Sequence, residues 1–260
     1  MALVAVLAVL LTIGILLPAA WVAPLATRYT QGRLELVDVT GSLWQGSAFL
    51  VLAPGGQPDP SLPSTDGRSG APMLMAARLP YRILWQAAFW PLFTGEVRLD
   101  VREDRPLSEK VRVVAGLNGA TVSAGGIAVP ASLLSGLGAP FNTLDLQGDT
   151  RLEWTEWHLL RSGAYGQLTV MLADMSSSVS RVRPLGSYRA IIRANGAGIA
   201  LQLSTEKGPL FLSGSGDGNA AGFQFSGQAR SGDEAKANLS GLLSLLGPRV
   251  DANTVALRFP

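Results

Sequence analysis

The feature that most constrains the fold of this chain is an alternation of apolar and polar residues that recurs along the sequence after residue 33. Val97, Leu99 and Val101, for example, alternate with charged neighbours. A period of two places successive side chains on opposite faces of an extended strand, so each such run predicts a half-buried β-strand. Similar runs occupy residues 144–146, 152–154, 168–172, 199–203, 223–225 and 255–259. They follow one another without long helices, which favours a mainly β fold, an antiparallel sheet with one apolar face.

Glycines separate many of these runs. The chain has 30 glycines among 260 residues, a larger share than the usual one of about 7 %. We expect hairpin turns at Asn118-Gly119, at Asn195-Gly196 and at residues 216–218. The glycine-rich residues 214–218 also resemble a phosphate-binding loop, but such a loop joins a strand to a helix. Because both flanking segments here have strand pattern, a hairpin turn is the favoured interpretation.

Helical pattern is confined to two short segments. Residues 130–137 could form one or two turns, beginning near Pro130. Residues 233–246 form the better candidate, because Leu239, Leu242, Leu243 and Leu246 recur at helical spacing before Gly247-Pro248, a typical helix stop. A short helix here would cover an open edge or end of the sheet.

Residues 54–72 have the composition of a long flexible loop. Five prolines and four glycines fall in these 19 residues. Such a segment buries too little apolar surface to order itself. Strand pattern resumes on both sides, so we interpret it as a loop within one domain.

The N-terminal segment is apolar, and its first charged side chain is Arg28. A bilayer core of about 30 Å needs roughly 20 helical residues, which residues 1–22 supply. A cleaved signal peptide would have a basic residue at its start, and a buried core helix of this length would have a polar face. The sequence therefore favours a retained transmembrane anchor over residues 1–24 and a β-rich domain over residues 25–260, outside the bilayer.

The sequence contains only a weak signal for the side of the membrane on which the β-rich domain lies. Arg28 and Arg33 follow the anchor, and the positive-inside rule would place the domain after them in the cytoplasm. This bias depends on two arginines, and long domains cross membranes largely regardless of charge.

Composition excludes several classes of function. A net charge of +2 without a basic run predicts no nucleic-acid partner. The absence of cysteine excludes disulfides, thiolate metal sites and cysteine nucleophiles. We expect no metal and no cofactor.

Candidate catalytic residues are few. His158, the single histidine, could serve as a base for a serine, but a polar residue at a strand end beside Trp157 is the favoured interpretation. Glu153 and Glu156 could form a pair of catalytic carboxylates. Three positions apart on a strand they would face opposite sides, which favours two unrelated surface charges. The sequence predicts no enzymatic activity, and a hydrolase that uses His158 is the open alternative.

One motif follows the anchor. Residues 34–48 read LELVDVTGSLWQGSA, and Gly41, Ser42, Leu43, Trp44 and Gly46 fit the element Gly-(Ser/Thr)-(Leu/Val)-Trp-x-Gly. With this element the chain resembles type II secretion system protein N, also called general secretion pathway protein N. The C-terminal residues 209–216 and 223–229, and the leucine-rich segment before Gly247, resemble that family in the same order.

The element itself has two interpretations. Gly41 and Gly46 would bracket a strand in which Trp44 buries an apolar surface of about 200 Å², with the glycines permitting a tight turn or a close backbone approach. A core anchor at the start of the sheet is favoured, and a contact with a partner protein is the alternative.

The resemblance implies a single-pass protein of the bacterial inner membrane with its bulk in the periplasm, opposite to the charge bias. Its partners would be other components of the machine that exports folded proteins across the outer membrane, and no enzymatic activity or cofactor is implied. The family is also distantly similar to AsmA-like proteins, whose curved antiparallel sheets form half-pipes or open barrels thought to hold lipid. A periplasmic lipid-binding or lipid-transfer groove is therefore the alternative function.

Overall fold

The computed structural model describes residues 17–30, 34–52, 77–105, 109–132, 134, 144–219 and 221–259. In this part of the chain the structure is mainly β-strand, and sheet neighbours with a described register are antiparallel, as the alternation predicts. The chain divides into two compact units, residues 1–114 and 115–260. The predicted loop over residues 54–72 lies outside the described residues.

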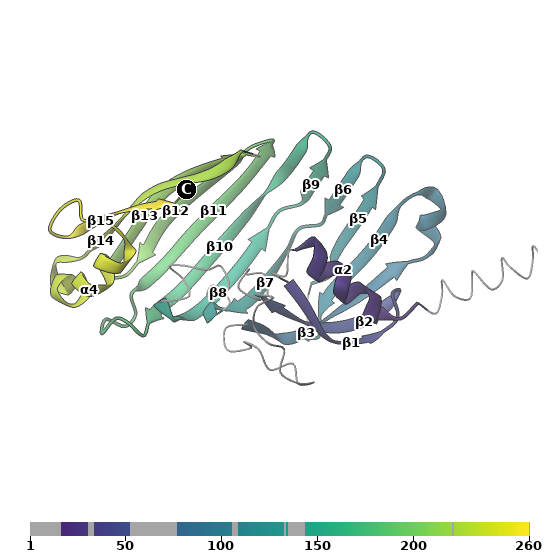
Figure 1. Cartoon of the computed structure of the whole chain (residues 1–260), viewed down its shortest axis with the longest axis horizontal. Helices are drawn as coiled ribbons and strands as arrows, with labels where there is room; N and C mark the ends of the chain where they lie inside the picture. The colour runs from purple at the N-terminus through teal and green to yellow at the C-terminus, as the bar shows by residue number, and fades with distance from the viewer. Residues whose placement is uncertain are drawn as a thin grey trace, which may run out of the picture. The chain divides into compact units, whose positions relative to one another are not determined.

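The first unit is a run of strands in sequence order. A 3-10 turn η1 (Ala19–Trp21) and a short helix α2 (Val22–Tyr29) precede the sheet, and η3 (Trp90–Thr94) joins the third strand to the fourth. Figure 1 shows α2 in purple beside the first strands. The neighbours in order are β1 (Leu34–Gly41), β2 (Gln45–Leu52), β3 (Ala77–Ala88), β4 (Val97–Glu103) and β5 (Val111–Gly116), the last of which crosses the boundary between the units.

The core of the first unit is small. Ala19, Ala48 and Trp85 are buried, and the partly buried side chains of Leu36, Val39, Leu99 and Val101 pack against them. Leu99 and Val101 are the inward-facing residues of the alternating run that predicted β4. One face of this short sheet therefore packs on the chain just before β1.

The second unit is built on longer strands. Its sheet order is β6-β9-β10-β11-β12-β13-β14-β15, and β8 pairs with β7 and β10. The strands can be followed in Figure 1 from teal to yellow. Their bounds are β6 (Gly119–Val122), β7 (Gly125–Pro130), β8 (Leu146–Trp154), β9 (Trp157–Leu160), β10 (Gly163–Ser177), β11 (Gly186–Gly196), β12 (Ile199–Lys207), β13 (Leu210–Asn219), β14 (Gly222–Ser231) and β15 (Thr254–Phe259).

Beside β10, the sheet contains two rows that are each made of two short strands, β9 with β8 and β6 with β7, and both rows are interrupted at the same level of the sheet. β8 and β9 pair with β10 one after the other, and β7 and β6 pair with them in turn. Residues 155 and 156 separate β8 from β9, and residues 123 and 124 separate β6 from β7. The Nε1 of Trp154 donates a hydrogen bond to the carbonyl oxygen of Ser123, 3.0 Å away, across this double break. Glu156 thus lies in the break and not on a strand with Glu153.

The register of the long strands collects their apolar residues on one face. Leu168 of β10 is opposite Ile192 of β11, which is opposite Leu201 of β12. One position away, Gln167 is opposite Arg193, and the Nε of Arg193 donates a hydrogen bond to the Oε1 of Gln167 at 2.9 Å. Because strand side chains alternate, one face is apolar and the other polar, as the sequence predicts.

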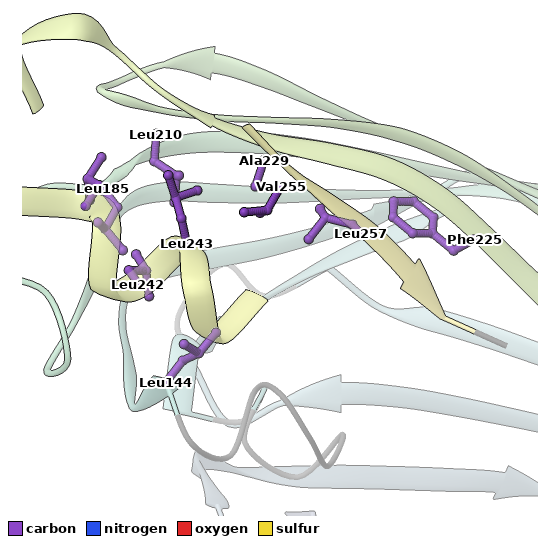
Figure 2. Packing of buried hydrophobic residues seen from close by; sticks show 10 residues of the cluster. Leu144, Leu185, Leu210, Phe225, Ala229, Leu242, Leu243, Val255 and Leu257 are labelled. Carbon is purple, nitrogen blue, oxygen red and sulfur yellow. The ribbon is translucent and has the colours of Figure 1, made fainter. Parts of the chain in front are cut away.

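A helix covers part of the apolar face. The 3-10 turn η5 (Asp233–Ala235) and α4 (Lys236–Leu246) span the predicted helical segment 233–246. Figure 2 shows Leu243 of α4 directed at the strands that carry Leu210 and Ala229. This buried cluster consists of Leu144, Leu185, Leu210, Phe225, Ala229, Leu239, Leu242, Leu243, Val255 and Leu257.

The segment after the helix lies against β15. The amide of Ala256 donates to the carbonyl oxygen of Pro248 at 2.9 Å, and the amide of Val250 to that of Thr254, also at 2.9 Å. The predicted stop at Gly247-Pro248 is confirmed. The helix covers the face of the last strands, and the residues after it pair with β15.

Two predicted elements differ from the structure. Residues 216–218 lie within β13, and the hairpin bend follows Asn219. Pro130 ends β7, residues 131, 132 and 134 have 3-10 geometry, and the rest of the predicted helix 130–137 lies outside the described residues.

Most of the predicted anchor also falls outside the described residues, which begin at Leu17. Among those that are described, no helix has both the length and the apolar character needed to cross a bilayer. The anchor over residues 1–24 stays a prediction.

Candidate functional site

The element from Gly41 to Gly46 forms the tight turn between β1 and β2. The amide of Ser42 donates to the carbonyl oxygen of Gln45 at 2.8 Å, and the amide of Gln45 donates to the Oγ of Ser42 at 3.1 Å. Gly41 has a φ of +93°, and a Cβ there would lie 2.8 Å from the Cα of Gly46. The expected strand between the two glycines is therefore wrong, and the expected tight turn is confirmed.

Gly46 lies under a buried tryptophan that the sequence interpretation did not single out. A Cβ at Gly46 would lie 2.8 Å from the Cε2 of Trp85 and 2.8 Å from the carbonyl oxygen of Thr40. The indole of Trp85 is 9 % exposed, and its Nε1 donates to the carbonyl oxygen of Leu43 at 3.1 Å. The core tryptophan of this region is thus Trp85 of β3, and the motif residues form the surface on which it packs.

Trp44 has a different role, because it is half-buried and joins the turn to a second aromatic group. Its ring contacts that of Phe89 edge to face, with centroids 5.0 Å apart. Its carbonyl oxygen accepts a hydrogen bond from the amide of Ala87 at 2.7 Å. Trp44 is therefore fixed against the end of β3.

We call Phe89, Trp90, Leu92 and Phe93 the aromatic turn, since they form the connection from β3 to β4. The Phe89 and Phe93 ring centroids lie 5.5 Å apart, and those of Trp90 and Phe93 lie 6.0 Å apart. Trp90 is nevertheless 80 % exposed and Phe93 68 % exposed. This exposure marks a surface suited to an apolar partner.

The same hairpin turn holds the chain that emerges from the N-terminal apolar segment. The amide of Leu43 donates to the carbonyl oxygen of Leu17 at 2.9 Å, and Pro18 forms a β-bridge with Ser42. Four residues of the motif therefore connect the N-terminal segment, the core tryptophan and the aromatic turn.

An arginine stabilises the adjoining part of β1. Asp38 has a φ of +55° at an irregularity in the pairing of β1 with β2. Its carboxylate accepts a hydrogen bond from the Nη1 of Arg82 at 2.7 Å, and its carbonyl oxygen accepts one from the Nη2, also at 2.7 Å. The guanidinium thus holds a strained position of the strand in place.

Charged residues line a shallow pocket beside Trp85 on the first unit. Its walls include Asp100, Arg102 and Lys110, and its volume is about 280 Å³. The Nε of Arg112 lies 2.8 Å from Asp100 and the Nζ of Lys110 lies 3.4 Å from it. The hydrogen bond from Arg112 lowers the pKa of Asp100, which therefore stays ionised. The two cations neutralise the carboxylate, so this pocket has the character of a solvated ion-pair cluster.

The apolar face of the second unit is the other candidate surface. Leu168, Val170, Ile192 and Leu201 are half-buried on it, whereas α4 packs against β14 and β15. Toward the β10–β11 turn, Tyr188 is buried in a second cluster with Ala131 and Met175. The face is thus enclosed at two places by described residues and partly accessible between them.

Three glycines on β13 shape this face. Glycine occupies three alternate positions of β13, Gly214, Gly216 and Gly218, which face the same side of the strand. The rings of Phe223 and Phe225 from β14 occupy the space where side chains at these positions would be. A Cβ at Gly214 would lie 2.8 Å from the Cα of Gly227. The glycine-rich segment that suggested a turn or phosphate loop is a packing surface for two phenylalanines.

The residues considered as catalytic candidates, His158, Glu153 and Glu156, do not form a cluster. His158 is exposed on β9 and paired with Thr121 and Tyr165 in the backbone register, and its imidazole has no hydrogen-bond partner among the described residues. Glu153 is exposed on β8, where its Oε1 lies 3.7 Å from the Nη1 of Arg151. Within the described ranges, no three histidine or carboxylate side chains cluster as metal ligands would.

The fold and these surfaces define a class of protein: an antiparallel-sheet protein with an aromatic turn on its first unit and a partly accessible apolar face on its second. The family follows from a comparison with known ones. Residues 32–258 match the family described as type II secretion system (T2SS), protein N, and the chain belongs to that family. It is thus a type II secretion system component, as the motif predicts. No curated protein and no solved structure matches the chain.

Proposed function

We propose that this protein is a single-pass inner-membrane component of the type II secretion system with its bulk in the periplasm. In this role it supports the export of folded proteins through contacts with other components of the system, without catalysing a reaction. The observation that carries the proposal is the family match, which extends over residues 32–258.

The geometry around the motif supports a membrane-tethered role. The apolar residues at the N-terminus lead directly into the first unit, because the carbonyl oxygen of Leu17 accepts a hydrogen bond from the amide of Leu43. A mobile tether would need no such contact. The anchor and the first unit are therefore joined by a structured connection at the β1–β2 turn.

A periplasmic location reverses the orientation that the positive-inside rule suggests. Only Arg28 and Arg33 produce that bias close to the anchor. The proposed location rests on family membership, and direct measurement of sidedness is the natural test.

Export of folded substrates tests the proposed role. In a strain in which this gene is the single copy, its deletion is expected to leave type II substrates in the periplasm, and the wild-type gene is expected to restore their release. Gly46→Ala, which disturbs the Trp85 packing, should restore export less well than Gly241→Ala, because a Cβ at Gly241 meets nothing within 4 Å. Unchanged export in the deletion strain would contradict the role.

Lipid binding is a second candidate function, favoured by the half-buried side chains of Leu168, Val170, Ile192 and Leu201 on the apolar face. Aliphatic side chains in a row offer a surface for acyl chains. Organic extraction of the purified protein followed by mass spectrometry should then release stoichiometric lipid.

A pair of variants makes the lipid test specific. Val170→Asp places a charge on the apolar face and should abolish lipid retention, whereas Thr169→Asp places it on the opposite face and should not. Absence of lipid in the wild-type protein, or equal retention by both variants, would exclude this function.

A further inference from the structure

The aromatic turn presents apolar side chains to solvent at one end of the first unit. Besides Trp90 and Phe93, Leu92 is 38 % exposed. The chain carries no charged residue between Arg82 and Glu96. Directly after the turn, Glu96 and Arg98 neutralise each other through an ion pair of 2.8 Å. The aromatic turn therefore carries no charged side chain, and the charges next to it are paired with each other. Such a surface suits the boundary between the apolar interior of a bilayer and its polar headgroups.

Contacts within the first unit connect this turn to the N-terminal segment. Phe89 packs on Trp44, and the adjoining Leu43 is hydrogen-bonded to Leu17. Leu17 lies in the N-terminal stretch that has no charged side chain before Arg28, and Trp21, 66 % exposed, follows four residues later. The exposed aromatic residues thus lie near the point at which the chain leaves its apolar segment.

We propose that the aromatic turn inserts into the interfacial layer of the bilayer that holds the anchor. Tryptophan and other amphipathic rings prefer this layer, where an apolar body meets carbonyl and headgroup dipoles. The structured connection through Leu43 and Leu17 keeps the turn close to wherever the anchor leaves the membrane. The inference rests on the anchor proposed above.

Insertion would give the first unit two points of attachment. A single tether leaves a domain free to rotate about the chain, whereas a second contact restricts that rotation. The turn would then set the orientation in which the strands of the first unit meet the membrane surface.

Depth-dependent fluorescence quenching tests the insertion. The chain has no cysteine, so a single one can be introduced and labelled without background. Leu92→Cys places an environment-sensitive fluorophore on the turn of the full-length protein. Asp104→Cys is the matched control, because Asp104 is exposed just beyond the far end of β4. Seven strand residues separate the two ends by about 20 Å.

Both labelled proteins are reconstituted in phospholipid vesicles that carry nitroxides either at the headgroup or along the acyl chains. We expect headgroup and shallow-chain nitroxides to quench the Leu92 probe at least about twofold more strongly than the Asp104 probe, since the turn lies in the interfacial layer. Circular dichroism of each variant checks that the sheet is retained.

Three outcomes have different meanings. Equal, weak quenching of both probes in protein that resists carbonate extraction overturns the insertion and keeps the anchor. Strong Leu92 quenching in protein that carbonate removes supports the insertion and overturns the anchor. A Leu92 probe that is unquenched in vesicles but becomes shielded when other secretion-system components are added assigns the turn to a protein partner and overturns the proposal.

Discussion

The indole of Trp85 lies across Gly46, and its Nε1 donates a hydrogen bond to the carbonyl oxygen of Leu43, 3.1 Å away. One side chain from β3 thereby contacts the turn between β1 and β2 at two points, Leu43 and Gly46. Because the same turn contacts Leu17 and supports Trp44, its geometry determines how the N-terminal segment and the aromatic turn are held.

Gly46→Ala is expected to destabilise the first unit. Its Cβ would lie 2.8 Å from the Cε2 of Trp85 and from the carbonyl oxygen of Thr40, so the ring or the strand must shift. Overpacking of this kind costs about 1–3 kcal/mol. Urea unfolding followed by tryptophan fluorescence measures the effect, with Gly241→Ala as the control, which should not destabilise because alanine is favoured over glycine inside helix α4. Equal midpoints for the two variants would contradict the packing described for Trp85.

Gly214→Ala is expected to disturb the second unit for a similar reason. The new methyl group would meet the ring of Phe225 and lie 2.8 Å from the Cα of Gly227. We expect a loss of about 1–3 kcal/mol in the free energy of unfolding. Ser215→Ala, on the exposed face of the same strand, should change it by less than about 0.5 kcal/mol. A larger effect at Ser215 than at Gly214 would show that the faces of β13 are assigned wrongly.

Leu239→Ala tests whether α4 is an integral part of the core. Leu239 is fully buried between the helix and the sheet, and removal of a buried leucine side chain costs about 2–5 kcal/mol. Leu245→Ala on the same helix is the control, because Leu245 is 60 % exposed. Thermal unfolding should separate the two variants clearly. Similar melting temperatures would mean that α4 does not pack on β14 and β15.

The buried phenol of Tyr188 is expected to make the free energy of unfolding depend on pH in the alkaline range. Burial raises the pKa of its phenol above the ordinary value of about 10, which the unfolded chain retains. The folded state therefore keeps its proton when the unfolded state loses it, and the free energy of unfolding falls as the pH rises above about 10. Below that pH the contribution of this group is constant.

Tyr188→Phe isolates this contribution. Within the described part of the chain, the Tyr188 hydroxyl is buried without a hydrogen-bond partner, so its removal should raise the free energy of unfolding by about 1 kcal/mol at neutral pH. The variant should also lose less stability than wild type between neutral pH and pH values above 10. Chemical denaturation at both pH values measures the two effects. A variant that is strongly destabilised at neutral pH would reveal a partner for the hydroxyl.

The sequence alone predicts the β class and several strands, because alternation is a local signal. The runs that contain Leu99, Leu168 and Leu201 all lie in strands, and the leucine spacing from 239 to 246 marks a true helix. The hairpin between β11 and β12 also follows from its Asn195-Gly196 pair, since that turn chemistry is local.

Longer-range contacts could not be predicted in the same way. Gly216 and Gly218 are residues typical of a turn, but they lie in a strand. Their positions leave no room for a side chain, because phenylalanines of the next strand pack on them, and only the strand register shows this. Trp44 was expected in the core because a tryptophan between Gly41 and Gly46 can bury a large apolar surface, whereas Trp85, 41 positions later in the sequence, fills that place. The double break beside Trp154 likewise depends on the pairing of four strands.

Protease accessibility in spheroplasts tests the central claim, a chain anchored in the inner membrane with its bulk in the periplasm. Proteinase is added to intact spheroplasts, and the full-length chain is followed together with a cytoplasmic marker protein. The account predicts that the chain is degraded while the marker stays intact. Persistence of the full-length chain until the membrane is permeabilised would place the domain in the cytoplasm and contradict the account.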